Sequence, residues 1–315
     1  MAERSAGPPL WLALTGSVFV GVLTAVQARI NGQLGLRLEH PMTAAVISFG
    51  SGLLLVALVS LALPSGRRGL SALGAGVRAR SIPWWMLAGG IAGALNVATQ
   101  SVAVGIVGVS LFTVGLVAGQ LGGGLVLDRA GYGPGGVVPV TLPRVVGAAL
   151  AVLAAGIMLS NTDGLGDVPV VVLILPVLAG LGLAWQQATN GRLRAHVGSA
   201  VTATFVNFFG GTAALLIGAV VAVVLIGPPS AFPSDPWLYL GGAIGVGYIM
   251  LTAALVVHTG VLLFGLSAVS GQLVASLIMD AAWPAPRSPG ILVEVVTVAV
   301  ALVAVVIAGV WRVRR

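Results

Sequence analysis

The sequence has no cysteine, no lysine and few charged residues of either sign, and each shortage excludes a class of protein. The absence of cysteine excludes a thiol nucleophile, a cysteine-ligated zinc site and a disulfide-stapled secreted domain. The absence of lysine excludes a nucleotide-binding P-loop, because its lysine contacts the phosphates. Charged residues make up only 7% of the 315 residues. That is too few for the polar surface of a water-soluble enzyme or a nucleic-acid-binding protein.

Apolar residues dominate instead: 58% of the chain is hydrophobic and 46 residues are glycine. A helix needs about 20 mostly apolar residues to cross about 30 Å of hydrocarbon. Ten runs meet this requirement, and they do not alternate between apolar and polar residues as β-barrel strands do. The sequence therefore predicts an all-α integral membrane protein with ten transmembrane helices. The predicted spans are Leu10–Ala28, Met42–Leu63, Pro83–Val104, Val107–Leu127, Arg144–Leu159, Pro169–Ala188, Val201–Ile226, Trp237–Val257, Gly260–Met279 and Gly290–Trp311.

The arginines predict how these spans are oriented, since cytoplasmic loops retain positive charge. With the N-terminus inside, all of the 15 arginines except Arg29, Arg37 and Arg287 fall on the inner side. Both termini are therefore expected in the cytoplasm. The arginine-rich stretch Arg67–Arg80 is expected to be a solvated cytoplasmic loop, and anionic lipid would favour its position.

The chain also contains an internal repeat. The pattern G-x3-A-x-Q-x3-N-G-x-L occurs at Gly21–Leu34 and again 159 residues later at Gly180–Leu193. A second offset of 152 residues relates the region from Trp85 to Asp128 to the region from Trp237 to Asp280. The sequence thus predicts two five-helix units, residues 1–160 and 161–315. Because five spans is an odd number, the second unit is inverted relative to the first, an arrangement associated with alternating-access transporters.

Six uncharged polar residues lie near the middle of the predicted spans, where polar groups are costly in lipid and usually face a partner or a cavity. Asn96 and Gln100 are four residues apart and share one helix face. Two readings stay open: the six residues line a substrate cavity, or they only hydrogen-bond helix to helix. Neutral amides and a phenol would suit a small polar or cationic organic solute. The six candidates are Asn96, Gln100, Gln120, Tyr248, Thr252 and Gln272.

Two further groups of residues are candidates for other roles. The repeated pairs Gln27/Asn31 and Gln186/Asn190 lie near opposite membrane faces, where an Asn-Gly step would end a helix or the pairs would gate the two mouths. Titratable groups for ion coupling are scarce and lie near span ends. These weak coupling candidates are Asp128, Asp280 and Glu294. The three histidines lack metal-ligand spacing, so neither a metal nor a cofactor is expected.

The paired segments at Gly21–Leu34 and Gly180–Leu193, and the G-Q-L-x6-D helix ends at Gly119–Asp128 and Gly271–Asp280, resemble the YdcZ-type inner-membrane exporters. This family belongs to the drug/metabolite transporter superfamily, in which five-helix units occur singly or fused in tandem. The resemblance covers essentially the whole chain and implies a bacterial inner-membrane location and export. Small multidrug exporters of this superfamily use an acidic residue in their first helix. Leu10–Ala28 contains none, so that coupling mechanism is not implied here.

We therefore expect a secondary transporter that exports a small polar or cationic organic solute by alternating access, not an enzyme. Its expected partners are the lipid bilayer and the solute, with no nucleic acid, and homo-oligomerisation is left open. One alternative is a non-transporting membrane scaffold, in which the mid-span polar residues only join helices. A less favoured alternative is an intramembrane enzyme acting on lipid-linked substrates, which would need a cluster of acids, histidines or a nucleophile that the sequence lacks.

Overall fold

The computed structural model describes residues 9–132, 136–137, 139–161, 168–229, 231–284 and 289–310, with only the backbone at 253–254, 256–263 and 309–310. All regular elements in this part of the chain are helical. The long helices are α1 (Leu10–Leu38), α2 (Pro41–Ala62), α3 (Pro64–Arg78), α4 (Gly89–Thr99), α5 (Gly105–Arg129), α6 (Leu142–Ser160), α7 (Val170–Val197), α8 (Ala200–Ile226), α9 (Gly241–Ala282) and α10 (Ile291–Val310). Short elements are the 3-10 turns η1 (Trp84–Leu87) and η4 (Pro236–Tyr239) and a π-helical turn, η2 (Gln100–Val104).

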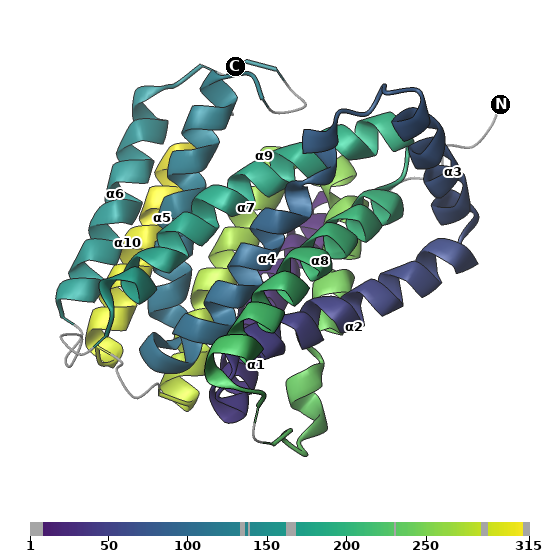
Figure 1. The fold of residues 1–315 in the computed structure, drawn as a ribbon. Coiled ribbons are helices and arrows are strands. Elements are labelled where there is room, and N and C mark those ends of the chain that lie inside the picture. The colour runs from purple at the N-terminus through teal and green to yellow at the C-terminus, as the bar shows by residue number, and fades with distance from the viewer. Residues whose placement is uncertain are drawn as a thin grey trace.

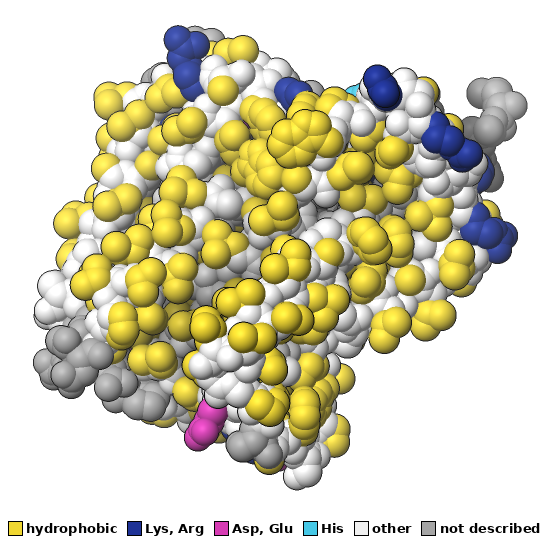
Figure 2. All heavy atoms as spheres, viewed as in Figure 1, with side chains coloured by type: hydrophobic (Ala, Val, Ile, Leu, Met, Phe, Trp, Pro, Cys, Tyr) yellow, Lys and Arg dark blue, Asp and Glu magenta, His cyan; other side chains and the backbone are white. Residues whose placement is uncertain are grey.

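The described helices confirm a multi-span membrane protein. Eight of the helical stretches are long and apolar enough to cross a membrane. Helices suit these runs because lipid offers no hydrogen-bond partner to an exposed backbone. Figure 2 shows hydrophobic side chains over most of the visible surface, with arginine side chains along the top and right of the view. In Figure 1, α6 and α10 pair on one side of the molecule, while α2 and α3 lie on the other.

Three elements differ from the sequence-based expectation, and one of them is α7, which continues beyond the predicted end at Ala188 up to Val197. Helix α1 continues ten residues beyond the predicted end at Ala28, up to Leu38. It does so because residues after Arg29 are buried against other helices rather than exposed in a loop. The Asn-Gly steps at Asn31 and Asn190 therefore lie inside helices and do not end them. The stretch expected as a loop forms α3, an amphipathic helix that begins with a proline in its first turn, which favours helix initiation.

The stretch from η1 through α5 doubles back on itself. Gly108 has φ 88° and ψ 167°, a left-handed conformation that glycine adopts easily and that breaks the helix. Both ends of the stretch lie near the same end of α7. Arg192 of α7 lies over the rings of Trp85, in η1, and Tyr132, just after α5. Its middle lies near the other end of α7, where Gly115 faces Pro176. The two arms of this stretch therefore form a helical hairpin against α7.

Helix α9 reverses in the same way, although its backbone is helical from Gly241 to Ala282. Its two ends lie near the C-terminal end of α1, whereas residue 255 lies near the start of α1. The contacts pair Gly241 with Asn31, Leu255 with Gly16, and Asp280 with Arg29. A straight helix of 42 residues would be about 63 Å long and would not return to the same end of α1. The second half thus contains a matching hairpin.

Each hairpin packs on the first helix of the opposite half: α9 on α1, and α4 with α5 on α7. Glycines permit these crossings. A Cβ at Gly271 would lie 2.1 Å from the Val18 carbonyl oxygen, and one at the equivalent Gly119 would lie 2.0 Å from that of Val177. Such backbone approach is how helices associate in lipid, where the hydrophobic effect is absent. Gly119 and Gly271 thus permit close helix contact at positions that the repeat makes equivalent.

Candidate functional site

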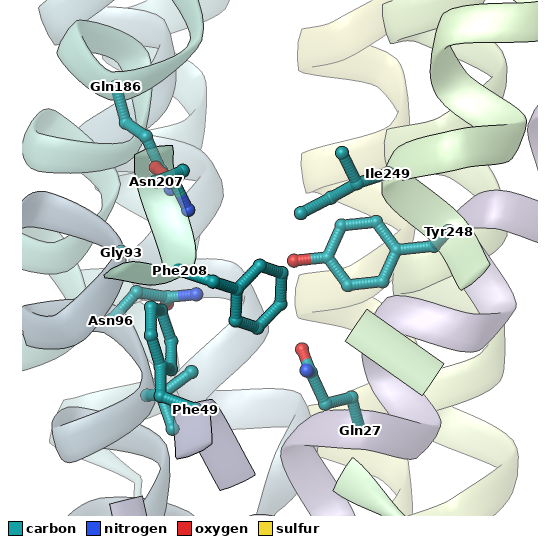
Figure 3. A pocket seen from close by; sticks show the side chains of 10 residues that line it. Gln27, Phe49, Gly93, Asn96, Gln186, Asn207, Phe208, Tyr248 and Ile249 are labelled. Carbon is teal, nitrogen blue, oxygen red and sulfur yellow. Dashed lines mark hydrogen bonds between the residues drawn. The ribbon is translucent and has the colours of Figure 1, made fainter. Parts of the chain in front are cut away.

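A small cavity lies at the centre of the helices, where the two halves meet (Figure 3). The cavity volume is about 10 Å³, which is room for about one water molecule. Its walls come from α1, α2 and α4 of the first half and from α7, α8 and α9 of the second. The lining residues are Gln27, Phe49, Gly93, Asn96, Val97, Gln186, Asn207, Phe208, Tyr248 and Ile249.

The lining is built from residues that the repeat makes equivalent. Gln27 corresponds to Gln186, and Phe49 to Phe208, by the offset of 159 residues. The two phenylalanine rings meet with their centroids 4.9 Å apart and their planes tilted by 42°. Asn96 corresponds to Tyr248 by the offset of 152 residues, and both side chains point into the cavity in Figure 3. The cavity therefore lies between the two halves and is lined by equivalent residues from each of them.

Two glycines bring the glutamines to the cavity wall. A Cβ at Gly93 would lie 2.5 Å from Gln186 Nε2, and a Cβ at Gly245 would lie 2.5 Å from Gln27 Nε2. Any larger residue would displace the amide, because real side chains do not approach so closely. Glycine at both positions thus lets a buried glutamine lie against the neighbouring helix.

On the α7 side of the cavity, three amides form a hydrogen-bonded group. Gln186 Nε2 donates to Asn207 Oδ1 at 2.7 Å, and Asn190 Nδ2 donates to the same oxygen at 3.1 Å. Asn207 was not predicted from the sequence. It corresponds to Ser48 in the first half, so a search for identical residues in the two halves does not find it.

On the α1 side, Gln27 and Asn31 have other hydrogen-bond partners, because Ser48 is too short to bridge them as Asn207 bridges Gln186 and Asn190. Gln27 Nε2 donates to the carbonyl oxygen of Gly241 at 2.8 Å. Asn31 Nδ2 donates to Gln100 Oε1 at 2.7 Å. Gln100 thus belongs to a buried amide pair with Asn31 and does not line the cavity. The pair joins α1 to the π-helical turn η2.

Three amide oxygens of cavity-lining residues have no hydrogen-bond partner although they are buried. They are Gln27 Oε1, Asn96 Oδ1 and Gln186 Oε1. The orientation of the Gln27 amide is fixed, because only its NH₂ group can donate to the Gly241 carbonyl. A buried polar atom without a partner costs free energy, about 1–3 kcal/mol. Such atoms are therefore places where water or a solute group would be accepted.

The other candidates for substrate contact lie away from the lining. Gln120 and Gln272 lie where the helices cross, with their backbone nitrogens beside Gly180 and Gly21. Thr252 Oγ1 donates to the carbonyl oxygen of Tyr248 within the same helix. Of the six mid-span residues, the cavity therefore brings together Asn96 and Tyr248. Gln27 and Gln186, which were candidate gate residues, join them.

The acidic candidates have distinct surroundings. Asp280 is buried, and its carboxylate accepts hydrogen bonds from the backbone N–H groups of Val109 at 3.0 Å and Ser110 at 2.6 Å. These N–H groups begin the part of α5 that follows the break at Gly108, and a carboxylate satisfies such groups well. Arg29 Nη1 lies 3.7 Å from Asp280 Oδ1. Asp280 therefore fastens the end of α9 to the start of α5.

Asp128 and Glu294 lie elsewhere. Asp128 pairs with Arg144 of α6, and both side chains are partly exposed. Glu294 is buried in the first turn of α10. Neither residue lines the cavity, and no group of three or more His, Asp or Glu side chains among the described residues is arranged to hold a metal ion.

In a comparison with known protein families, two successive segments of the chain match the same family. The profile of the family described as "Putative inner membrane exporter, YdcZ" matches residues 12–159 and again residues 171–307. The chain thus consists of two tandem copies of the family's unit. No curated protein matches the chain. A solved crystal structure shares the fold, with a TM-score of 0.51, 19% sequence identity, and coverage of 96% of this chain and 98% of the other.

Proposed function

Because the chain belongs to the YdcZ family of inner membrane exporters, we propose that it moves a small polar or cationic organic solute across the membrane by alternating access. The observation that carries this proposal is the central cavity, whose lining is contributed in equivalent pairs by both halves. Membrane transport agrees with the family and with the many apolar helices. It also agrees with the expectation that the chain is not an enzyme.

The proposed architecture is ten transmembrane spans in two inverted five-helix units, residues 1–160 and 161–315, with both termini in the cytoplasm. The two doubled-back stretches support ten spans, because each of them would cross the membrane twice although its helical backbone is nearly continuous. The arginine distribution supports the orientation. Arg192 lies at one end of α7, whereas Arg29 lies at the C-terminal end of α1 beside Asp280. If the second half is inverted relative to the first, these two arginines would lie at opposite membrane faces.

The class of solute follows from the groups that face the cavity. The free oxygens of Gln27, Asn96 and Gln186 would accept hydrogen bonds from N–H or O–H groups. The rings of Phe49 and Phe208 would stabilise a cation over their faces, by about 0.5–2 kcal/mol. The lining contains no charged side chain. An ammonium or guanidinium solute, or a neutral solute rich in N–H and O–H donors, would therefore fit better than an anion.

The volume of the cavity supports a cycle rather than an open pore. Space for about one water molecule cannot admit an organic solute, so the helices must separate on one side to admit it. The inverted relation provides the means, because exchanging the conformations of the two halves would exchange the open side. Since the chain has no lysine-containing phosphate loop, the driving force would be a gradient of solute or ion.

The test is counterflow by the purified full-length chain in liposomes. The vesicles are loaded with a candidate solute, and uptake of its labelled form is measured for amines, guanidines, sugars, amino acids and organic acids. Amines, guanidines or donor-rich neutral solutes should accumulate, and acids should not. The variant Asn96→Ala should raise the solute concentration for half-maximal uptake by about 2–10-fold, the effect of one lost hydrogen bond.

A matched substitution controls for folding. Asn161→Ala removes the same side chain at the exposed end of α6, where the amide bonds only to Ile157 and Ser160. It should leave uptake unchanged. A folded protein that exchanges none of the solutes would contradict the proposal and favour the scaffold alternative. Equal loss in Asn96→Ala and Asn161→Ala would remove the cavity as the solute site.

A further inference from the structure

The seam between α1 and the π-helical turn η2 is tightly closed. A Cβ at Gly35 would lie 2.1 Å from the Ser101 carbonyl oxygen, and a Cβ at Gly32 would lie 2.7 Å from Val104 Cβ. Asn31 and Gln100 are each 0% exposed, and their amides are hydrogen-bonded across the seam at 2.7 Å. Two backbones and one amide pair therefore close this path to the cavity.

The repeat predicts an equivalent seam between α7 and the first part of α9. The residues equivalent to Asn31 and Gly35 are Asn190 and Arg194, and the residue equivalent to Gln100 is Thr252. All three are half-buried, in contrast to their fully buried counterparts. The hydroxyl of Thr252 bonds to its own helix, at the Tyr248 carbonyl. The second seam therefore lacks the amide pair that joins the first.

Chemistry explains why the two seams differ. Asn190 donates to Asn207 Oδ1, an oxygen that has no counterpart in the first half because Ser48 stands there. Asn31 is therefore available to Gln100, whereas Asn190 is held by its own half. Threonine at 252 carries a hydroxyl instead of an amide, so it cannot form the equivalent amide pair with Asn190. Among the described side chains, the first seam thus has a hydrogen-bonded lock between helices and the second has none.

We propose that the Asn31–Gln100 amide pair is the lock of the outer gate, and that this structure is closed to the outside and more open on the cytoplasmic side. The lock rests on the proposed alternating access, whose cycle would break it each time the outer mouth opens. Neither residue contacts the solute cavity. Both are therefore positioning residues that set the balance between the two open states.

The absence of cysteine makes this testable with single-cysteine reporters. Ser101→Cys reports the outer seam, where Ser101 is buried, and Thr252→Cys reports the inner seam, where Thr252 is half-buried. A membrane-impermeant maleimide is applied to right-side-out and inside-out vesicles without any solute. Thr252→Cys should react from the cytoplasmic side, and Ser101→Cys should react slowly from either side.

The lock is then removed with Gln100→Ala, or with Gln100→Thr, which introduces the residue found at the equivalent position. Either change should raise labelling of Ser101→Cys from outside about fivefold and lower labelling of Thr252→Cys, as expected for the loss of one buried hydrogen bond. Thr24→Val is the control. Its hydroxyl bonds only within α1, to the Val20 carbonyl, so both reporters should keep their rates.

A complementary variant adds a lock to the inner seam. Thr252→Gln supplies the amide that the repeat pairs with Asn190, so it should hold the cytoplasmic mouth closed and raise labelling of Ser101→Cys from outside. A residue with a merely structural role would not produce this gain. The proposal is overturned if Ser101→Cys reacts freely in the unaltered background, if Gln100→Thr raises both reporters alike, or if Thr252→Gln leaves Ser101→Cys unchanged.

These outcomes are separate from those of the transport test, because labelling needs no solute. A chain that exchanges solute while the Gln100 variants leave both reporters unchanged would overturn the lock and leave the proposed function standing. A chain with the expected labelling that exchanges no solute would do the reverse.

Discussion

Replacing Asp280 by asparagine should destabilise the protein far more than the same change at its repeat counterpart, Asp128. The Asp280 carboxylate accepts two backbone hydrogen bonds, from Val109 and Ser110, in a site that is buried. An amide has nearly the same shape, but its NH₂ group cannot accept. One N–H group at the start of this part of α5 would therefore lose its partner, and Arg29 would lose its countercharge.

The size of the effect follows from those contacts. A hydrogen bond to a charged group contributes about 1.5–3 kcal/mol, and an orphaned buried N–H group costs about 1–3 kcal/mol, so Asp280→Asn should cost about 2–4 kcal/mol. At about 2 °C per kcal/mol for a chain of this size, the thermal midpoint should fall by about 4–8 °C. Asp128 and Arg144 are 29% and 19% exposed, so their pair should contribute at most about 1 kcal/mol.

The assay is thermal unfolding of the purified chain in one detergent, followed by loss of the monodisperse peak after heating. Similar midpoints for Asp280→Asn and Asp128→Asn would refute the reasoning that the carboxylate holds the two hairpins together. Solute flux against a proton gradient is a second readout. If Asp280 has only this fastening role, the surviving folded fraction should keep any dependence on the gradient, whereas a coupling residue would lose it.

Three other changes test separate contacts. Gly271→Ala would place a methyl group 2.1 Å from the Val18 carbonyl oxygen, so overpacking should cost about 1–3 kcal/mol and lower the thermal midpoint. Gly35→Ala would meet the Ser101 carbonyl oxygen at 2.1 Å, so it should keep the outer seam apart and speed maleimide labelling from outside by at least tenfold. Phe208→Ala removes a ring from the cavity wall, so the half-saturation concentration in counterflow should rise by about 2–30-fold for an organic cation, and less for a neutral solute.

Much of the fold was predictable because the membrane imposes simple rules on sequence. Apolar runs of sufficient length predicted a helical membrane protein, and eight of the described helical stretches are long and apolar enough to cross a membrane. The boundaries were harder. A rule based on apolar runs ends the first span at Arg29, yet the chain remains helical there because Arg29 pairs with Asp280 inside the protein. A single sequence does not reveal such long-range partners.

The cavity was predicted only in part, for a related reason. Asn96 and Tyr248 were found by their position within spans, and both line the cavity. Gln100 lies one helical turn from Asn96 but bonds to Asn31 instead, which depends on how η2 packs against α1. Asn207 was missed because its counterpart is a serine. Residues that make the two halves differ are invisible to an argument based on what the halves share.

The measurement that bears most directly on the account is the labelling of Ser101→Cys and Thr252→Cys in the presence of a solute that the protein transports. Alternating access through the central cavity predicts that this solute changes the two labelling rates in opposite directions, and that a solute which is not transported changes neither. Asn96→Ala should weaken the response without abolishing labelling. Transport that proceeds while both rates stay fixed at every solute concentration would contradict the account.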